Sequence, residues 1–262
     1  MKNFILCALL NLIAVSCALA DEPDYPFVVG EELTFKVKFG WFTVGKAQIK
    51  ITSDTTNKAE PSFHVKVEAR TAGILGFFKH TVNQFDAVIS QSELKPSIAT
   101  QNFLDNQKRD IQTNYFDYKK GKVRVERVNY EKDKKYAPEF YGIDSTTYDI
   151  LSTYLYLRSS YLKSTQPNDS IMVKMFFGNK PYDFGMEYAG VERIKTQLGE
   201  IQAHKLYLLF PVSSAFPEPK AVIVWVTMDK NQLPLKIEAQ LKFGRVFCDL
   251  TSHKNLKEPC MR

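Results

Sequence analysis

The sequence has few of the residues that define specialised protein classes. Its 262 residues include only 4 cysteines, 12 glycines and 12 prolines, with no glycine or proline period of the kind that builds fibres. Hydrophobic residues make up 44% and charged residues 24%, so the composition is not that of a disordered chain. A chain of this length can bury a substantial core without disulfide bonds.

Motifs that carry chemistry are also missing. The sequence has no G-x-S-x-G elbow, no glycine-rich phosphate loop, no H-E-x-x-H and no paired cysteine motif. The four histidines, His64, His80, His204 and His253, are scattered, and we expect each to be a polar surface residue rather than a ligand or base. Triads can form across distant segments, so spatial convergence stays open. The sequence itself predicts no catalytic residue, no cofactor and no metal site.

Only one hydrophobic run is long, and it lies at the amino terminus. A short basic start is followed by an apolar run over residues 4–15, and Ala18 and Ala20 occupy the two positions that a signal peptidase reads. This pattern predicts a signal peptide over residues 1–20, cleaved before Asp21. No later stretch reaches the roughly 20 apolar residues of a transmembrane helix. We therefore expect an exported protein of the periplasm or cell envelope, with no transmembrane segment in the mature chain.

An alternative reading concerns Cys17. This cysteine could become a lipidated first residue, although a lipoprotein site usually has leucine where this sequence has Ala14. After cleavage at residue 20, the remaining cysteines are Cys248 and Cys260. In an exported chain they could form a disulfide or remain two thiols, and both alternatives stay open. A zinc site would need more ligands than the one histidine between them, His253.

Most of the chain shows the period of two that is typical of half-buried strands. Apolar and polar residues alternate over residues 33–39, 46–51, 63–70 and 235–243. Two runs, 171–177 and 221–228, are apolar nearly throughout, so we expect both faces of these strands to be covered. Turn signals separate the segments, which favours an antiparallel meander over a parallel sheet.

One segment has helical spacing. Ile150, Tyr154, Leu157 and Tyr161 predict an amphipathic helix near residues 147–162, with Asp144, Ser145 or Thr146 as its cap. We therefore predict an all-β fold, mostly antiparallel, forming a single large domain over residues 21–262. The expected architecture is an open or half-closed barrel-like meander whose concave face is covered by the central helix. A two-sheet sandwich is the alternative.

Three blocks resemble a known family. They are residues 30–49 (GEELTFKVKFGWFTVGKAQI), 149–158 (DILSTYLYLR) and 224–244 (VWVTMDKNQLPLKIEAQLKFG). In this order they are similar to blocks of an exported bacterial family known as domain of unknown function 3108. The resemblance spans nearly all of the mature chain. It implies a mostly antiparallel β protein of the bacterial envelope, and it implies no activity and no catalytic residues.

Basic residues are concentrated in one segment, over residues 119–135. Its positive side chains are Lys119, Lys120, Lys122, Arg124, Arg127, Lys132, Lys134 and Lys135, against three acidic ones. This surface could contact lipid phosphates, an acidic glycan or the acidic face of an envelope protein. Alternatively, it is a solvated hairpin whose charged edge discourages strand pairing. Nucleic acid is not expected as a partner of an exported chain.

Two apolar segments are candidates for ligand binding. Residues 72–79 include Ile74, Leu75, Phe77 and Phe78 between glycines, and they could form a lid, an apolar tip or a buried connection. Trp41 and Phe42 form a similar aromatic pair at a predicted hairpin.

The sequence therefore favours a non-enzymatic binding or carrier module for an apolar small molecule or lipid. A structural or interaction protein of the envelope is the alternative. A glycan or lipid hydrolase is the third hypothesis, and it would need two carboxyl groups across a cleft, for which no sequence feature exists.

Overall fold

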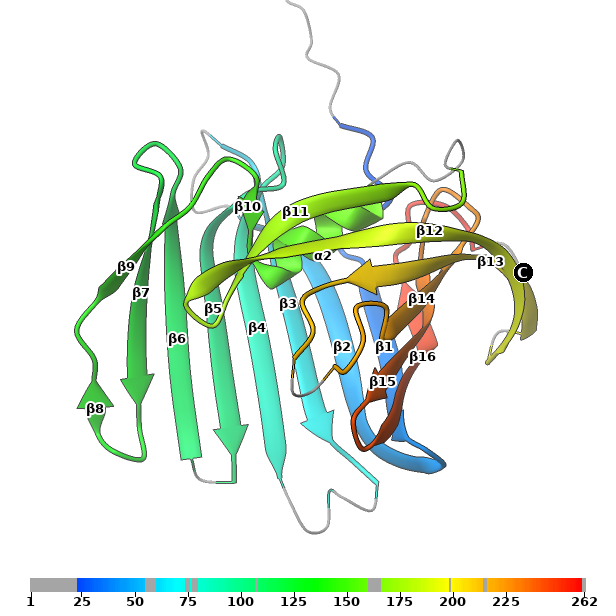
Figure 1. The fold of residues 1–262 in the computed structure, drawn as a ribbon, viewed down its shortest axis with the longest axis horizontal. Helices are drawn as coiled ribbons and strands as arrows, with labels where there is room; N and C mark the ends of the chain where they lie inside the picture. Colours follow the sequence, from blue (N-terminus) through cyan, green and yellow to red (C-terminus); the bar gives the residue numbers. More distant parts are fainter. Residues whose placement is uncertain are drawn as a thin grey trace, which may run out of the picture.

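The computed structural model describes residues 23–54, 60–73, 76, 80–106, 108–159, 166–197, 199–213 and 216–260. Its first half is a wall of long strands that pair with one another in chain order (Figure 1). These strands are β1 (Glu32–Phe39), β2 (Phe42–Asp54), β3 (Ser62–Thr71), β4 (Thr81–Ser90), β5 (Pro96–Asp105), β6 (Lys108–Asp117) and β7 (Lys122–Asn129). Two short strands, β8 (Lys134–Lys135) and β9 (Glu139–Gly142), both pair with β7.

The second half begins with a short strand and the helix, and then continues as a second meander. Its elements are β10 (Thr147–Tyr148), α2 (Ile150–Ser159), β11 (Ser170–Phe177), β12 (Lys180–Thr196), β13 (Gly199–Leu209), β14 (Val222–Thr227), β15 (Pro234–Leu241) and β16 (Gly244–Lys254). The last strand, β16, pairs antiparallel with β1 and so joins the two halves into one 16-stranded sheet.

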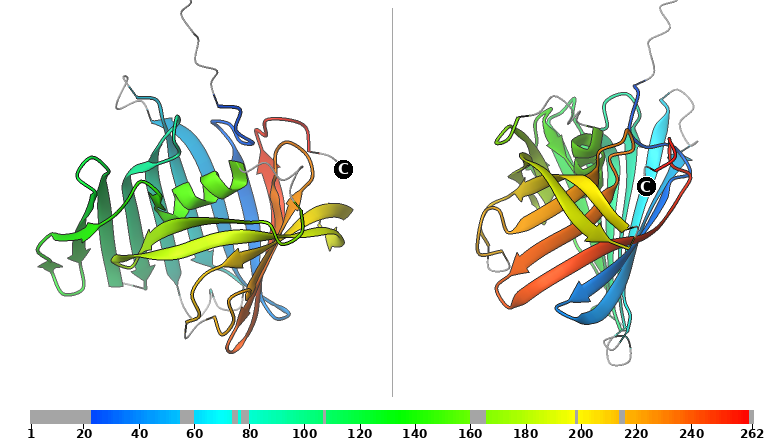
Figure 2. Two further views of the ribbon diagram at one scale, coloured as in Figure 1. Left: turned by 45° about the horizontal axis from the view of Figure 1, so that its top comes forward. Right: turned by 90° about the vertical axis from the view of Figure 1, so that its right-hand side faces the viewer.

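The sheet bends around the helix without closing. In Figure 1 the strands β11 to β13 cross in front of the wall formed by β1 to β7, and Figure 2 shows α2 between these two parts. Within the described residues, no pairing joins β10 at one edge to β8 or β9 at the other. Every pair is antiparallel except β10 with β11. The predicted all-β, half-open meander with one central helix is confirmed, and one continuous sheet replaces the alternative of a sandwich.

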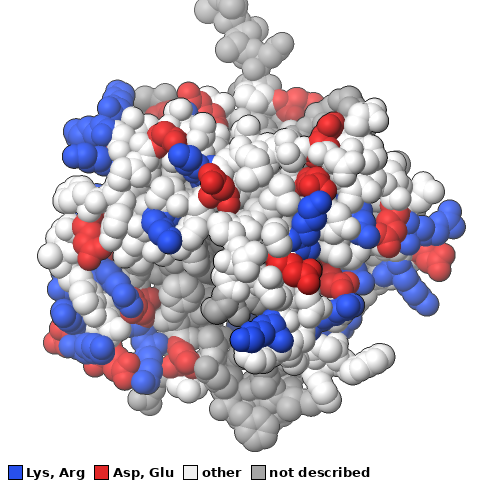
Figure 3. All heavy atoms as spheres, viewed as in Figure 1, with Lys and Arg blue, Asp and Glu red and all other residues white. Residues whose placement is uncertain are grey.

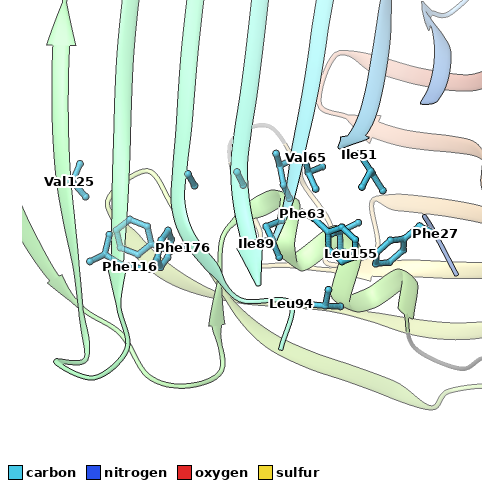
Figure 4. Close-up of a cluster of buried hydrophobic side chains, with 14 residues drawn as sticks. Phe27, Ile51, Phe63, Val65, Ile89, Leu94, Phe116, Val125, Leu155 and Phe176 are labelled. Carbon is cyan, nitrogen blue, oxygen red and sulfur yellow. The ribbon is translucent and has the colours of Figure 1, made fainter. Parts of the chain in front are cut away.

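The helix is anchored in a core on the inner face of β2 to β7. Leu155 is fully buried there with Ile89, Val65 and Phe63, and Phe176 of β11 reaches the same cluster (Figure 4). The inward residues of β3, Phe63 and Val65, are two apart, as the period of a strand requires. One face of α2 is therefore fixed against the first half of the sheet.

The helix cap differs from the predicted one. Asp149 is the N-cap, because its carboxylate accepts the backbone N–H groups of Leu151 (3.0 Å) and Ser152 (2.9 Å). Ser152 Oγ in turn accepts the N–H of Asp149 at 2.9 Å. The prediction of Asp144, Ser145 or Thr146 as the cap is wrong: these residues lie before β10, and the Asp144 carboxylate accepts hydrogen bonds from Thr146 N–H and Thr147 Oγ1.

The two apolar runs have different outcomes. Strand β14 is buried on both faces, as predicted. On one side lie α2 and the inner cavity, and on the other the side chains of Lys205 and Lys236 lie over the ring of Trp225. The same prediction is wrong for β11. Met172 and Lys174 of this strand are exposed, because β11 lies next to the sheet edge and only the two residues of β10 pair beyond it.

Candidate functional site

A cavity of about 360 Å³ lies between α2 and the inner face of the sheet, and we call it the helix cavity. This volume falls within the range of about 300–1,000 Å³ that is typical of small-molecule sites. Its lining comes from α2, from β1 to β3 and from β11 to β16. The cavity therefore exists only because the two halves of the sheet fold towards each other around the helix.

The helix contributes one face to the cavity. Its lining residues are Ile150, Thr153, Tyr154, Leu157 and Arg158, at offsets of 3, 4, 7 and 8 from the first. These offsets define a single face of an α-helix. Three of the four residues that carried the helical pattern in the sequence thus face the cavity. The fourth, Tyr161, lies outside the described residues.

Apolar side chains make up the two walls. Phe35, Ala47, Ile49 and Val67 come from β1, β2 and β3. The opposing wall is built by residues of the second meander, namely Met175, Phe184, Met186, Leu206, Leu208, Val224, Val226, Pro234, Ile237 and Cys248. Alternation along each strand explains the pattern, because residues two apart share a face. The described lining contains no aspartate or glutamate.

Arg158 is the one charged residue in this lining, and its guanidinium is already bound to other groups of the protein. Nη1 and Nη2 bind the two carboxylate oxygens of Glu31 at 2.5 and 2.8 Å. The remaining donors go to Tyr154 Oη (2.9 Å) and to the backbone oxygens of Asn231 and Pro26. Because all three nitrogens have acceptors, the arginine links helix, amino-terminal segment and β14–β15 turn, and it offers no vacant donor to a carboxylate in the cavity.

Thr153 supplies a polar group of a different kind. Its side chain is 2% exposed, and among the described residues its Oγ1 has no hydrogen-bond partner. A buried hydroxyl without a partner costs free energy, so such groups in native proteins call for a physical reason. Because Thr153 also lines the helix cavity, a bound molecule with one polar group near it would supply the missing partner.

Both carboxy-terminal cysteines are thiols in the described structure rather than a disulfide. Cys248 lines the helix cavity, and burial raises the pKa of its thiol to about 11. Burial also raises the pKa of Cys260, which packs against the same core cluster as Cys248. A thiol with a raised pKa is a poor nucleophile at neutral pH, so Cys248 acts here as an apolar wall residue.

The aromatic candidates do not meet in the cavity. Trp41 and Phe42 lie at the turn between β1 and β2, where their side chains are 97% and 61% exposed. Neither lines the helix cavity. Ile74, Leu75, Phe77 and Phe78 lie outside the described residues, as do the proposed signal peptide and Cys17.

The basic segment folds as β7, the turn before it and β8, on the outer part of the first wall. Many of its charges are paired: Lys120 binds Asp117 at 2.9 Å, Arg127 binds Asp110 at 2.5 Å and Arg124 pairs with Glu126. On the face drawn in Figure 3, basic and acidic side chains are interspersed over the side where β6 to β9 lie. The same segment contains five further lysines, namely Lys119, Lys122, Lys132, Lys134 and Lys135. The Nζ atom of Lys134 lies over the ring of Tyr136, 4.6 Å from its centroid.

The expectation for one histidine is wrong. His204 is buried, and its Nδ1 lies 3.1 Å from Tyr188 Oη. Its strand β13 places it on the same face as Leu206 and Leu208, so alternation puts it inside. His64 has the expected half-exposed position, 3.2 Å from Asp86 Oδ1. Burial of His204 therefore follows from strand register, which the residue type alone did not indicate.

Sequence reasoning missed the polar centre of the site. Glu31 and Arg158 are 127 positions apart, and no local motif links an acidic residue before a strand to an arginine late in a helix. Thr153 is also not marked as a site residue in the sequence, because threonine is an ordinary residue within a helix. The helical spacing of Ile150, Tyr154 and Leu157 was the one signal that pointed to the cavity.

Two further observations concern the described part of the chain. No group of three His, Cys, Asp or Glu side chains is arranged to hold a metal ion there. No helix among these residues has the length and apolar character needed to cross a membrane.

Comparison with known proteins identifies the family of this chain and shows a likeness to solved structures. The family model described as "Protein of unknown function (DUF3108)" matches residues 34–251, and no curated protein matches the chain. A β-barrel-like protein of domain of unknown function DUF1849 from Brucella abortus is similar in structure. Its TM-score is 0.58 at 7% identity, over 88% of this chain and 99% of that chain.

A second solved structure, a protein with a YmcC-like fold from Bacteroides fragilis, covers 88% of this chain and 98% of its own. Its TM-score is 0.33 and its identity 10%. The first likeness agrees with a half-open, barrel-like sheet.

Proposed function

This chain belongs to the family described as "Protein of unknown function (DUF3108)", and we propose that it is a non-enzymatic binding protein for an apolar or amphipathic small molecule. The observation that carries the proposal is the helix cavity, which has the volume of a ligand site and an almost wholly apolar lining. The family assignment names no activity, and the described lining holds no carboxylate pair of the kind that glycoside hydrolysis needs.

The polar groups of the cavity define the kind of molecule that fits. An apolar body would pack against the sheet, and one hydroxyl, carbonyl or ether oxygen would meet Thr153 Oγ1. A bare carboxylate would lie buried without a cation, because Arg158 is committed to Glu31. A neutral amphipathic molecule therefore matches the site better than a fatty acid.

The cellular compartment that the sequence predicts supports the same function. The apolar run and small residues at positions 4–20 are typical of export, so we propose a periplasmic or cell-envelope carrier. Such a compartment contains lipids whose apolar parts need shielding from water, which a cavity between sheet and helix would provide.

Filling the cavity should weaken ligand binding. We expect the fluorescence of N-phenyl-1-naphthylamine, an apolar dye, to rise when it is titrated into the wild-type chain. Ala47→Phe places a ring in the helix cavity, and the dissociation constant should increase at least about tenfold, equivalent to ~1.4 kcal/mol. Lys46→Phe, one residue earlier on the exposed face of β2, is the matched control and should bind like wild type.

Equal dye binding in Ala47→Phe and wild type would place the dye elsewhere, and no binding by the wild type would remove the proposal. Thermal melting of both variants checks that each is folded. Val67→Phe, which fills the cavity from β3, serves as a second variant if Ala47→Phe proves unstable.

A further inference from the structure

Two turns at one end of the molecule expose aromatic side chains. Trp41 and Phe42 project from the β1–β2 turn, and Phe243 of the β15–β16 turn is 83% exposed. Large aromatic side chains lose favourable free energy when they remain in water, and contiguous exposed apolar surface marks a contact site. The exposure of these three aromatic side chains at adjacent turns is therefore not explained by the stability of the fold.

These turns lie side by side. Strand β1 pairs with β16 up to Phe39 and Val246, and Gly40 N–H donates to Arg245 O at 3.0 Å. The ring of Phe39 covers Gly244, since a Cβ built at this glycine would lie 2.8 Å from Phe39 Cζ. Both Figure 1 and Figure 2 show the two turns next to each other at the same end of the sheet. We call Phe39, Trp41, Phe42 and Phe243 the aromatic tip.

A basic groove of about 680 Å³ adjoins the tip and includes Trp41 in its lining. The charged residues of this lining are Lys38, Lys195, Lys236, Arg245 and Asp249. Lys38 pairs with Asp249 at 2.5 Å and Arg245 with Glu238 at 3.2 Å. Lys195 and Lys236 make no salt bridge within the described residues, so the groove carries an excess of positive charge.

We propose that the aromatic tip inserts into the interface of an anionic lipid bilayer, and that the basic groove receives lipid phosphate groups. Tryptophan favours the interfacial region of a bilayer, where its ring is partly apolar and partly hydrated. Lysine and arginine next to inserted aromatics add attraction to anionic lipids. The aromatics project from two narrow turns rather than from a flat surface, which suits insertion between headgroups. This contact does not depend on a ligand in the helix cavity.

Trp41 can report its own insertion. The sequence has two tryptophans, and Trp225 is buried in β14, so Trp225→Phe leaves Trp41 as the sole tryptophan, which can be excited selectively over tyrosine. With vesicles of phosphatidylglycerol and phosphatidylcholine, the emission of Trp41 should shift to shorter wavelength and be quenched by brominated acyl chains. With phosphatidylcholine alone, both effects should be much weaker. If Trp225→Phe does not fold, sedimentation of the wild-type chain with the same vesicles replaces the fluorescence experiment.

Matched variants test the residues. Trp41→Ser combined with Phe243→Ser should lower the partition coefficient for anionic vesicles at least about tenfold. Phe140→Ser changes a 63% exposed phenylalanine of β9, away from the tip, and should stay within about twofold of wild type. Lys195→Glu with Lys236→Glu should remove the preference for anionic vesicles while leaving the dye binding of the helix cavity unchanged.

Three outcomes would overturn the proposal. The first is that Trp41 emission is insensitive to anionic vesicles, and the second is that Phe140→Ser loses as much binding as the tip variant. The third is a Trp41 shift that depends on protein concentration without vesicles, because it would assign the tip to contact between two copies of the chain.

Discussion

At the scale of single residues, Arg158 is the group on which the site depends. Its guanidinium and the Glu31 carboxylate are both almost fully buried. A buried ion pair gives little net stability compared with apolar residues, but loss of one partner leaves an uncompensated charge in the interior. The pair therefore fixes where the helix docks more than it adds to the free energy of unfolding.

This argument predicts a non-additive pair of substitutions. Arg158→Met should lower the free energy of unfolding by roughly 3 to 5 kcal/mol, because Glu31 is left buried and unpaired. In the double variant with Glu31→Gln, the loss should be smaller than the sum of the two single losses. Chemical denaturation of the four proteins measures this, and simple additivity would show that the two groups do not act as a pair.

His204 gives the fold a dependence on pH. Burial lowers the pKa of its imidazole below the ordinary value of 6.5, so the folded chain holds it neutral. In acid, the unfolded chain takes up a proton that the folded chain does not. The stability that neutral His204 allows is therefore present above pH 6.5 and is lost as the pH falls from there towards the folded-state pKa.

His204→Gln should remove this dependence while keeping a hydrogen-bonding group beside Tyr188 Oη. We expect the Tm of wild type to fall more than that of the variant as the pH is lowered from about 7.5 to about 5.5, on either side of the ordinary histidine pKa. Parallel Tm profiles for the two proteins would exclude His204 as the source.

At the scale of secondary-structure elements, the contact of β11 with β12 is set by Gly185. Its partner across the pair is Met172, and a Cβ at Gly185 would lie 2.2 Å from Ile171 O. Backbone cannot move away from such a contact without separating the strands. Phe184 and Met186, on either side of this glycine, line the helix cavity, so the close approach also positions one wall of the site.

Gly185→Ala should therefore lower the free energy of unfolding by about 2 kcal/mol. The control is Gly142→Ala in β9, where no heavy atom lies within 4 Å of the new methyl group. The control should change stability by no more than about 0.5 kcal/mol. Equal losses at the two positions would mean that strand propensity rather than the contact with Ile171 explains the effect.

The elements also show how far the sequence predicts this structure. Alternation over 33–39 and 63–70 matches β1 and β3 closely, and helical spacing located α2 to within three residues at its start. Local pattern could do this because strand and helix periods are properties of neighbouring residues. The pattern also predicted that the strand containing Trp225 is covered on both faces, but it did not predict whether the side chain of Trp41 lies in solvent or in a ligand site.

What the pattern left out is non-local. Bulges at Thr34/Phe35 and Val37/Lys38 change the register of β1 against both of its neighbours, and the pairing of Glu32 with Lys254 spans more than 200 positions. The bend of the sheet, the helix cavity and the Glu31–Arg158 pair all depend on those long-range contacts. A single sequence contains no signal that fixes them.

At the scale of the whole molecule, two features lie in different places and have different roles. The helix cavity is lined by α2 and both halves of the sheet, whereas the aromatic tip lies at the turns where β1 ends and β16 begins. Within the described residues, one strand pair, β1 with β16, joins the two halves of the sheet, and α2 packs against both halves. Together they are the basis of the two proposals, an apolar ligand in the helix cavity and a lipid surface at the aromatic tip.

Native mass spectrometry tests the central claim most directly. The chain would be purified without detergent from the cells that produce it, and its native mass compared with its denatured mass and with that of Ala47→Phe. We predict a reproducible non-covalent adduct on the wild type that is released on unfolding and is absent from Ala47→Phe. A bare wild-type chain, or the same adduct on both proteins, would contradict the assignment of the helix cavity as a ligand site.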